Sequence, residues 1–138
     1  MITLPTSVNY GVRILWALER HRRRNRRRIQ PIPLAVIARE LHLPQQYLAQ
    51  IARKLTRAGM LESFEGIRGG YRLSGSLHRI TLGDVVAALE PPRPLVRCLS
   101  RDDRRCPCAG SCEQTTWWRN VERQLAAVIG ATPLTASL

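Results

Sequence analysis

The sequence predicts a mainly α-helical protein with a small β-hairpin, in which a winged helix-turn-helix domain precedes a long C-terminal helix. Three features support this. Two short segments with helical apolar spacing meet at a proline-containing break, residues 42–44. Two strand-like segments then flank a glycine-rich turn at residues 66–70. Finally, residues 113–129 form one amphipathic stretch without glycine or proline.

Length and composition are those of one domain with an aliphatic core. The chain has 138 residues, of which 44% are hydrophobic and only 5% aromatic. No apolar run approaches the ~20 residues of a membrane span. Residues 1–10 lack the charged start and apolar stretch of a signal peptide. We therefore expect a cytoplasmic protein without a membrane partner.

The charge is strongly basic. The formal net charge is +12, and Lys54 is the one lysine among 22 basic residues. An arginine-biased composition explains arginine over lysine, but it does not explain the excess over ten acidic residues. A solvated basic surface is the alternative, but the excess favours a polyanionic partner, most often nucleic acid.

The first predicted helix covers residues 7–20 and begins at a Thr6 or Ser7 cap. Seven arginines follow within the nine residues 20–28, and this run is expected to fray into a mobile basic loop, residues 20–31, that includes His21. The loop is either simply solvated or contacts phosphates without reading bases. The phosphate candidates are Arg26, Arg27 and Arg28.

The helix-turn-helix follows. Pro33 opens a short helix, and Pro44 opens a second one with apolar residues at i, i+3, i+4 and i+7 from Leu48. The other face of the second helix is polar and almost without acidic residues. Since Gln can pair with adenine and Arg with guanine, this face predicts major-groove reading, against the alternative of an ordinary helical hairpin. The predicted DNA-binding residues are Gln45, Gln46, Tyr47, Ala49, Gln50, Arg53, Lys54 and Arg57.

A wing is predicted next. Gly59 ends the second helix, and strands 61–64 and 71–73 flank the turn. Arg68 at the tip is expected to enter a minor groove or touch phosphate, with Gly69 beside it and Arg72 as a weaker phosphate contact.

Two further helices are predicted. Thr81 caps the helix 82–89, which has Asp84 in its first turn. The long helix 113–129 carries an apolar stripe that needs a partner surface, either its own domain or a second copy in a two-fold dimer. The stripe consists of Trp117, Trp118, Val121, Leu125, Val128 and Ile129.

All four cysteines lie in the fifteen residues from Cys98 to Cys112. Such crowding indicates a metal, an iron–sulfur cluster or a thiol–disulfide switch. The spacers of seven, one and three residues are unlike the paired spacing of zinc sites. Nearby arginines would offset the charge of a thiolate-bound cluster.

Taken in order, the motifs resemble the winged-helix transcriptional regulators typified by IscR and NsrR. The resemblance covers nearly the whole chain, although the arginine run is longer than usual. It implies a homodimeric bacterial transcription factor whose long helix crosses between subunits. The matching segments are residues 9–13, 34–38, 44–51, 55–61, 66–73 and 80–85, Trp118 and residues 132–138.

Many members of that family hold an iron–sulfur cluster on three cysteines before the long helix. The resemblance therefore predicts a repressor of a double-stranded DNA operator that senses cluster supply, nitric oxide or redox state. The cluster type, 2Fe–2S or 4Fe–4S, stays open. The alternatives are a metal-free thiol-redox or zinc-dependent repressor and a basic RNA-associated protein.

The fourth cluster ligand is a separate question. Relatives use a residue that corresponds here to Thr115, a poor ligand, or to Asn9 of the partner subunit, a weak one. We therefore expect Cys108 to be the fourth ligand, with Asn9 as the alternative. The full predicted set is Cys98, Cys106, Cys108 and Cys112.

The predicted division is a DNA-binding domain at 1–90, a cysteine loop at 91–112, a dimerisation helix at 113–130 and a tail at 131–138. The sequence shows no paired carboxylates in a plausible cleft, no Ser/His/Asp set and no phosphate-binding glycine loop. We therefore expect neither an enzyme nor a small-molecule substrate.

Overall fold

The computed structural model describes residues 3–25, 30–100, 108 and 111–135. Its helices and strands confirm the predicted fold class, mainly α-helical with one small hairpin. Within the described residues, none of the helices combines the length and apolarity that a bilayer span requires. The elements are α1 (Thr6–Arg24), α2 (Leu34–Leu41), α3 (Gln45–Arg57), β1 (Leu61–Phe64), β2 (Gly70–Leu73), η1 (Leu77–Arg79), α4 (Leu82–Leu89), η2 (Arg97–Leu99) and α5 (Glu113–Ala131).

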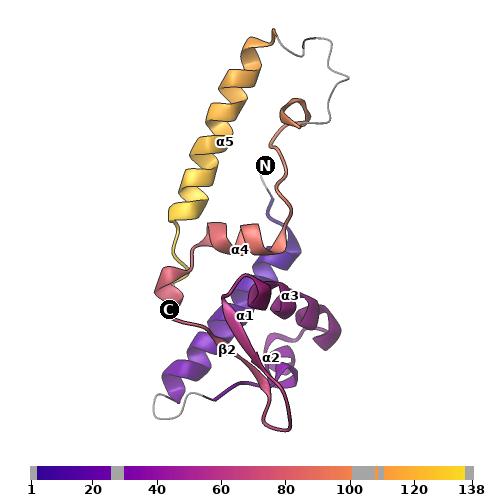
Figure 1. Ribbon diagram of the computed structural model, residues 1–138, viewed down its shortest axis with the longest axis vertical. Coiled ribbons are helices and arrows are strands. Elements are labelled where there is room, and N and C mark those ends of the chain that lie inside the picture. The colour runs from indigo at the N-terminus through magenta and orange to yellow at the C-terminus, as the bar shows by residue number, and fades with distance from the viewer. Residues whose placement is uncertain (1–2, 26–29, 101–107, 109–110, 136–138) are drawn as a thin grey trace.

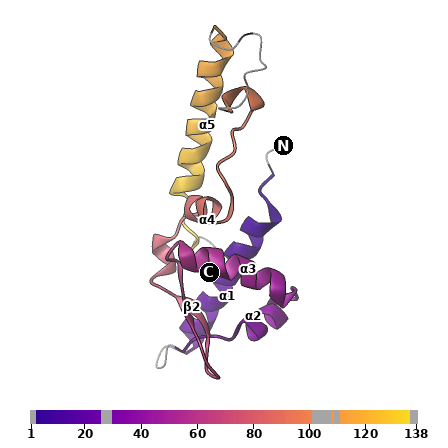
Figure 2. The same ribbon diagram turned by 45° about the vertical axis from the view of Figure 1, so that its right-hand side comes forward.

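The molecule is elongated. Helices α1 to α3 and the hairpin form a body at one end, and α4 lies across it (Figure 1). Helix α5 rises from the α4 side, away from the hairpin, in both views (Figure 2). The η2 turn and the first residues of α5 lie at the far end from the hairpin.

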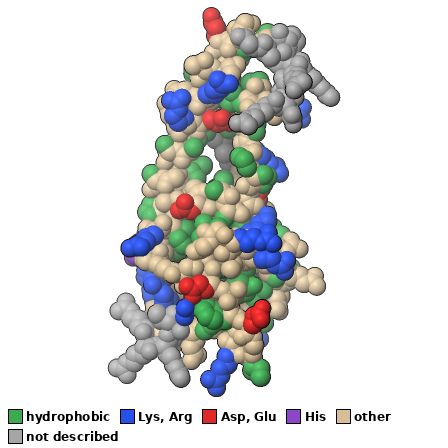
Figure 3. All heavy atoms as spheres, viewed as in Figure 1, with side chains coloured by type: hydrophobic (Ala, Val, Ile, Leu, Met, Phe, Trp, Pro, Cys, Tyr) green, Lys and Arg blue, Asp and Glu red, His purple; other side chains and the backbone are tan. Residues whose placement is uncertain are grey.

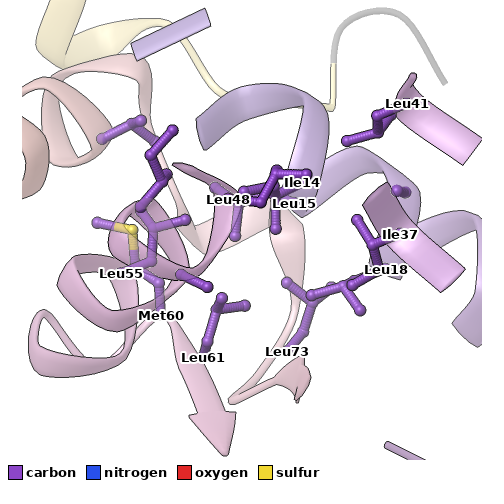
Figure 4. Close-up of a cluster of buried hydrophobic side chains, with 14 of the residues drawn as sticks. Ile14, Leu15, Leu18, Ile37, Leu41, Leu48, Leu55, Met60, Leu61 and Leu73 are labelled. Atoms are coloured by element: carbon purple, nitrogen blue, oxygen red, sulfur yellow. The ribbon is translucent and has the colours of Figure 1, made fainter. Parts of the chain in front are cut away.

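An aliphatic core holds the body together (Figure 4). Ile14 and Leu15 of α1 meet Ile37 of α2 and Leu48 and Leu55 of α3, and all five side chains are fully buried. Their helical spacing places them on the inward faces, so that the remaining faces stay free for other contacts. Burial of each such side chain stabilises the fold by about 1.5–3 kcal/mol.

The hairpin is joined to the segment before α2. Strand β1 pairs antiparallel with β2 in a register that sets Leu61 opposite Leu73. Ile32 and Tyr71 also exchange two backbone hydrogen bonds of 2.8 and 2.9 Å. Gly70 has φ 150°, and a Cβ there would lie 2.3 Å from the Ile32 carbonyl oxygen. Glycine is therefore required where the wing meets this third segment.

The predicted end of the first helix is wrong, because α1 continues to Arg24 through the first half of the arginine run. Glu19, only 2% exposed, accepts hydrogen bonds from Arg22 and Arg23. Arg20 donates to Glu40 of α2, and the Nε2 atom of His21 lies 3.0 Å from the other carboxylate oxygen. These pairs stabilise the helix where the run was expected to fray, so His21 is a helix residue rather than a loop residue.

The predicted cap of α1 is also wrong. The helix begins after Pro5, without a side-chain cap. The Ser7 hydroxyl instead donates to the Glu90 carboxylate at the end of α4. By contrast, the predicted start of α4 is confirmed, since Thr81 and Asp84 form a complete capping box.

The two carboxylates of the α1 end make stability depend on pH. Burial raises the pKa of the Glu19 carboxyl, but hydrogen bonds from Arg22 and Arg23 outweigh it and leave this pKa lowered. Burial and the bonds from Arg20 and His21 act in the same way on the pKa of Glu40, with the same lowered result. The folded state thus binds fewer protons than the unfolded chain. This stabilisation is present above the ordinary glutamate pKa of about 4.3 and is lost as pH falls through the lowered folded values.

We therefore expect the free energy of unfolding to fall between pH 7 and pH 3, and to fall less in the variant Glu19→Gln/Glu40→Gln. Urea denaturation at both pH values measures the difference. Glu65→Gln, an exposed wing residue, is the control and should behave as the wild type. An equal fall in the double variant would contradict the role of the two ion-paired clusters.

The base of α5 is fixed to the body at its C-terminal end. The Trp16 Nε1 atom donates to the Leu134 carbonyl at 2.7 Å, and the Leu82 amide donates to the Thr132 carbonyl at 2.8 Å. A Cβ at Gly83 would lie 2.9 Å from the Gly130 Cα atom, so α4 and α5 meet at two glycines. Along its described side chains α5 has no buried residue. Of the predicted apolar stripe, Trp118, Val121, Leu125 and Ile129 are half-buried, whereas Trp117 and Val128 are exposed.

Candidate functional site

The outer face of α3 is polar and accessible. Because Leu48, Ile51 and Leu55 turn inward and are buried, the opposite face of the same helix is turned to solvent. A helix with exposed amide and guanidinium donors has the size and chemistry to read base edges in a major groove. The exposed predicted residues include Gln45, Gln46, Gln50, Arg53, Lys54 and Arg57.

Tyr47 and Ala49 are placed differently. The Tyr47 ring meets the Tyr10 ring edge-on, with centroids 5.7 Å apart, and Tyr47 remains 36% exposed. Arg13 lies over Tyr10 and donates to the Leu41 carbonyl at 2.9 Å. This stack fixes the beginning of α3 against α1 and the end of α2. Ala49 is half-buried.

Two of the predicted DNA-binding cations already have partners within the protein. The Lys54 Nζ atom donates to the Leu89 carbonyl at 2.9 Å. Arg72 donates to Glu62 at 2.7 Å and lies over the Phe64 ring, 4.6 Å from its centroid. Both residues therefore brace elements, α3 against α4 and one strand of the wing against the other.

The wing tip presents two unlike side chains. Arg68 is exposed, and the adjacent Ile67 is fully exposed. Gly69 makes the turn possible, because a Cβ there would lie 2.3 Å from the Phe64 carbonyl oxygen. On the face shown in Figure 3, Lys and Arg side chains are spread over the body and the far end, with fewer acidic ones among them. The phosphate candidates Arg26, Arg27 and Arg28 lie outside the described residues.

Three of the four cysteines are described, and all three are free thiols. Cys98 is exposed in η2, which contacts α5. Cys108 is exposed in a turn, where its carbonyl accepts from the Ser111 amide at 3.1 Å. Cys112 is half-buried and is the N-cap residue of α5. Cys106 lies outside the described residues.

The donor set fits an iron–sulfur cluster in its chemistry. Thiolates are the usual ligands of such clusters. The described free thiols lie near the N-terminus of α5, where the helix dipole places a partial positive charge. Among the described residues, no three His, Cys, Asp or Glu side chains converge on a common metal position. Asn9, the alternative ligand, is exposed on α1.

Comparison with known proteins decides the family. The family model Rrf2, described as iron-dependent transcriptional regulators, matches residues 4–136. The chain belongs to the Rrf2 family. Among curated relatives, the HTH-type transcriptional regulator IscR of Vibrio campbellii is 30% identical over 123 residues, which are 89% of this chain and 69% of that protein.

Solved Rrf2 relatives share the fold. CymR, the global cysteine regulator of B. subtilis, is 28% identical with a TM-score of 0.71, over 97% of this chain and 94% of that one. T. potens IscR is 26% identical with a TM-score of 0.69, over 96% and 83%. The predicted IscR-type membership is confirmed. The chain is a DNA-binding transcriptional regulator, and its relatives are regulators rather than enzymes.

Sequence reasoning missed several residues of this Rrf2 chain. Ile32 extends the wing, Tyr10 stacks on α3, and the pairs Ser7–Glu90 and Lys54–Leu89 join α4 to its neighbours. Each contact joins residues far apart in sequence, so no local sequence pattern predicts it. The exposure of Ile67 could have been predicted, because an apolar residue within a glycine-rich turn has no core to pack against.

Proposed function

We propose that this Rrf2 protein is a repressor that reads a specific operator with α3 and the wing. The observation that carries the proposal is the exposed, acid-poor face of α3 that bears Gln50, Arg53 and Arg57. Arg68 at the wing tip is proposed as a minor-groove or phosphate contact. Arg26, Arg27 and Arg28 are proposed to add phosphate contacts that carry no sequence information.

Specific recognition is tested by selecting a duplex from a random library and comparing it with a random duplex at the same salt concentration. The electrostatic contribution is common to both, so a reader of sequence binds the selected duplex about 1,000-fold or more tightly. Equal affinities would contradict the proposal and favour a basic protein that binds nucleic acid by charge alone.

We further propose that α5 pairs with α5 of a second copy. Trp117 is 59% exposed and Val128 66% exposed, and large apolar side chains exposed along one helix are a feature of protein interaction surfaces. Green apolar side chains are visible along α5 in Figure 3. A two-fold pair would present two α3 helices to a palindromic operator, in the cytoplasm where such an operator is found.

The signal is proposed to enter at the cysteines. Cys98, Cys106, Cys108 and Cys112 would hold an iron–sulfur cluster, which when bound supplies a centre sensitive to iron–sulfur supply, nitric oxide or redox state. The free thiols and their place at the start of α5 support this proposal. Zinc or a metal-free thiol switch would use the same cysteines, and metal analysis of the purified protein distinguishes the three.

Cys108 is proposed as the fourth ligand. The variant Cys108→Ala should lose most of its iron and sulfide and the visible absorption of the cluster, because one thiolate is removed from a four-thiolate site. Anaerobic iron and sulfide assays with an absorption spectrum measure this. Ser111→Ala, in the same turn, is the control. If Cys108→Ala keeps a cluster of unchanged spectrum and lifetime, another ligand such as Asn9 of the partner subunit must be sought.

A further inference from the structure

Lys54 occupies an unexpected position for a cation on a DNA-facing helix. It is the one lysine of the chain, and its Nζ atom donates to the carbonyl of Leu89, the last residue of α4. The final carbonyls of a helix lack intrahelical partners and carry partial negative charge. A lysine placed there satisfies one of them, and it holds the C-terminal half of α3 against the end of α4.

Two more contacts converge on the same point. Glu90, which follows α4, accepts a hydrogen bond from Ser7 near the start of α1. Leu89 is 2% exposed and packs on α1 at Gly11, where a Cβ would lie 2.5 Å from the Leu89 Cδ1 atom. The end of α4 is therefore held by α1 on one side and by α3 on the other. We call Leu89 and Glu90, with their partners Lys54 and Ser7, the α4 junction.

The α4 junction lies where the cysteine segment leaves the body. Pro91 and Pro92 follow Glu90 directly and restrict the backbone. Further on, the Leu95 amide donates to the Glu122 carboxylate of α5. The chain then reaches Cys98 in η2. Residues 91–97 thus connect Cys98 to Glu90, the residue after the one whose carbonyl Lys54 holds.

We propose that Lys54 is a positioning residue for DNA reading rather than a phosphate contact, and that the α4 junction transmits the state of the cysteine segment to α3. The second half rests on the proposed control of DNA binding by the cysteines. The physical basis is that α3 has one charge-assisted hydrogen bond to the element from which that segment departs. This bond adds to the direct packing of α3 against α4, and it couples the position of α3 to the state of the segment.

Salt dependence separates the two roles of Lys54. Lys54→Met keeps the aliphatic stem and removes the bond, so operator affinity should fall about 10-fold for each protomer, as for loss of one charge-assisted hydrogen bond. The slope of log affinity against log salt should stay at the wild-type value. A phosphate contact would lower the slope by about 0.9 per protomer, and that result would overturn the positioning role. Arg68→Met, at the exposed wing tip, serves for comparison, and the melting temperature of each variant shows that it is folded.

Coupling is tested by a double-mutant cycle. The ratio of operator affinities between cluster-loaded protein and the Cys98→Ser variant is measured first with Lys54 and then with Met at this position. We expect the ratio to differ from one by about fivefold or more with Lys54, and to approach one in the Lys54→Met background. Arg39→Met, on the exposed side of α2, should leave the ratio unchanged.

The outcomes are distinguishable. A ratio that differs from one and persists in Lys54→Met contradicts the α4 junction while leaving cysteine control intact. A ratio of one in the Lys54 background contradicts cysteine control, and transmission through the junction is rejected with it. In that case the salt slope alone still decides whether Lys54 positions α3 or binds phosphate.

Discussion

Replacing Trp117 and Val128 with glutamate is expected to give a monomer whose affinity for a palindromic operator is reduced about 100-fold or more. Both side chains are exposed in the protomer, so their loss does not remove core packing. In a dimer they would be buried, where a carboxylate without a partner is costly. Losing the dimer removes the advantage of two linked reading heads, which is commonly worth about 100- to 10,000-fold.

Sedimentation equilibrium measures the oligomeric state, and titration of a two-half-site duplex measures affinity. Ala126→Glu is the control, since it lies two residues from Val128 and so on the other side of the helix. It adds a charge to the same exposed helix without touching the proposed interface. A double variant that stays dimeric, or a monomeric wild type, would contradict pairing through α5.

The second large effect is expected from Gln50→Ala/Arg53→Ala on α3. Each residue is exposed on the predicted reading face, and loss of a bidentate base contact costs about 1 kcal/mol or more. Two substitutions in each of two protomers then give about 4 kcal/mol, or about 1,000-fold in operator affinity. Binding to random duplex should change by about 10-fold or less, because most of the electrostatic contribution remains.

Competition titrations with selected and random duplexes at one salt concentration measure both effects. Arg39→Ala removes an exposed arginine from α2 and serves as the control, with little expected change in the specificity ratio. A double variant that loses affinity equally for both duplexes would show that these side chains contact phosphate and that bases are read elsewhere.

Local sequence patterns predicted those elements that are determined by residues close together in sequence. The Thr81 cap of α4, with Asp84 in the first turn, and the hairpin around Gly70 appear in the structure where the sequence places them. The end of α1 could be predicted in this way only in part. The pairs of Glu19 with Arg22 and Arg23 are local, at i+3 and i+4. Glu40, which binds Arg20 and His21, lies on another helix, and no local pattern shows that it is near them.

The outer face of α3 also shows what local patterns predict and what they do not. From spacing alone, Arg53 and Lys54 were both predicted to bind DNA, since both are cations on the polar side of α3. Both are exposed, but the structure separates them because the Lys54 Nζ atom donates to the Leu89 carbonyl. A lysine stem is long enough to reach a neighbouring helix end, and only the placement of α4 shows whether it does.

The cysteine segment was predicted as a group of thiols, and the described members are accessible free thiols near the start of α5. Their spacing is unlike that of zinc sites, but the residue type alone does not identify the bound group, because cysteines bind clusters and zinc and also form disulfides. The description of the Rrf2 family as iron-dependent regulators favours iron over zinc as the bound metal. Choosing among these groups requires chemical analysis.

The most direct test of cysteine control is the operator affinity of anaerobically purified protein before and after removal of its iron and sulfide, at fixed salt. The proposal predicts about one iron–sulfur cluster per chain and at least a fivefold change in affinity when the cluster is removed. The same treatment should not change the affinity of the Cys98→Ser variant. Iron-free protein as purified anaerobically, with an operator affinity equal to that of Cys98→Ser, would contradict control by an iron–sulfur cluster.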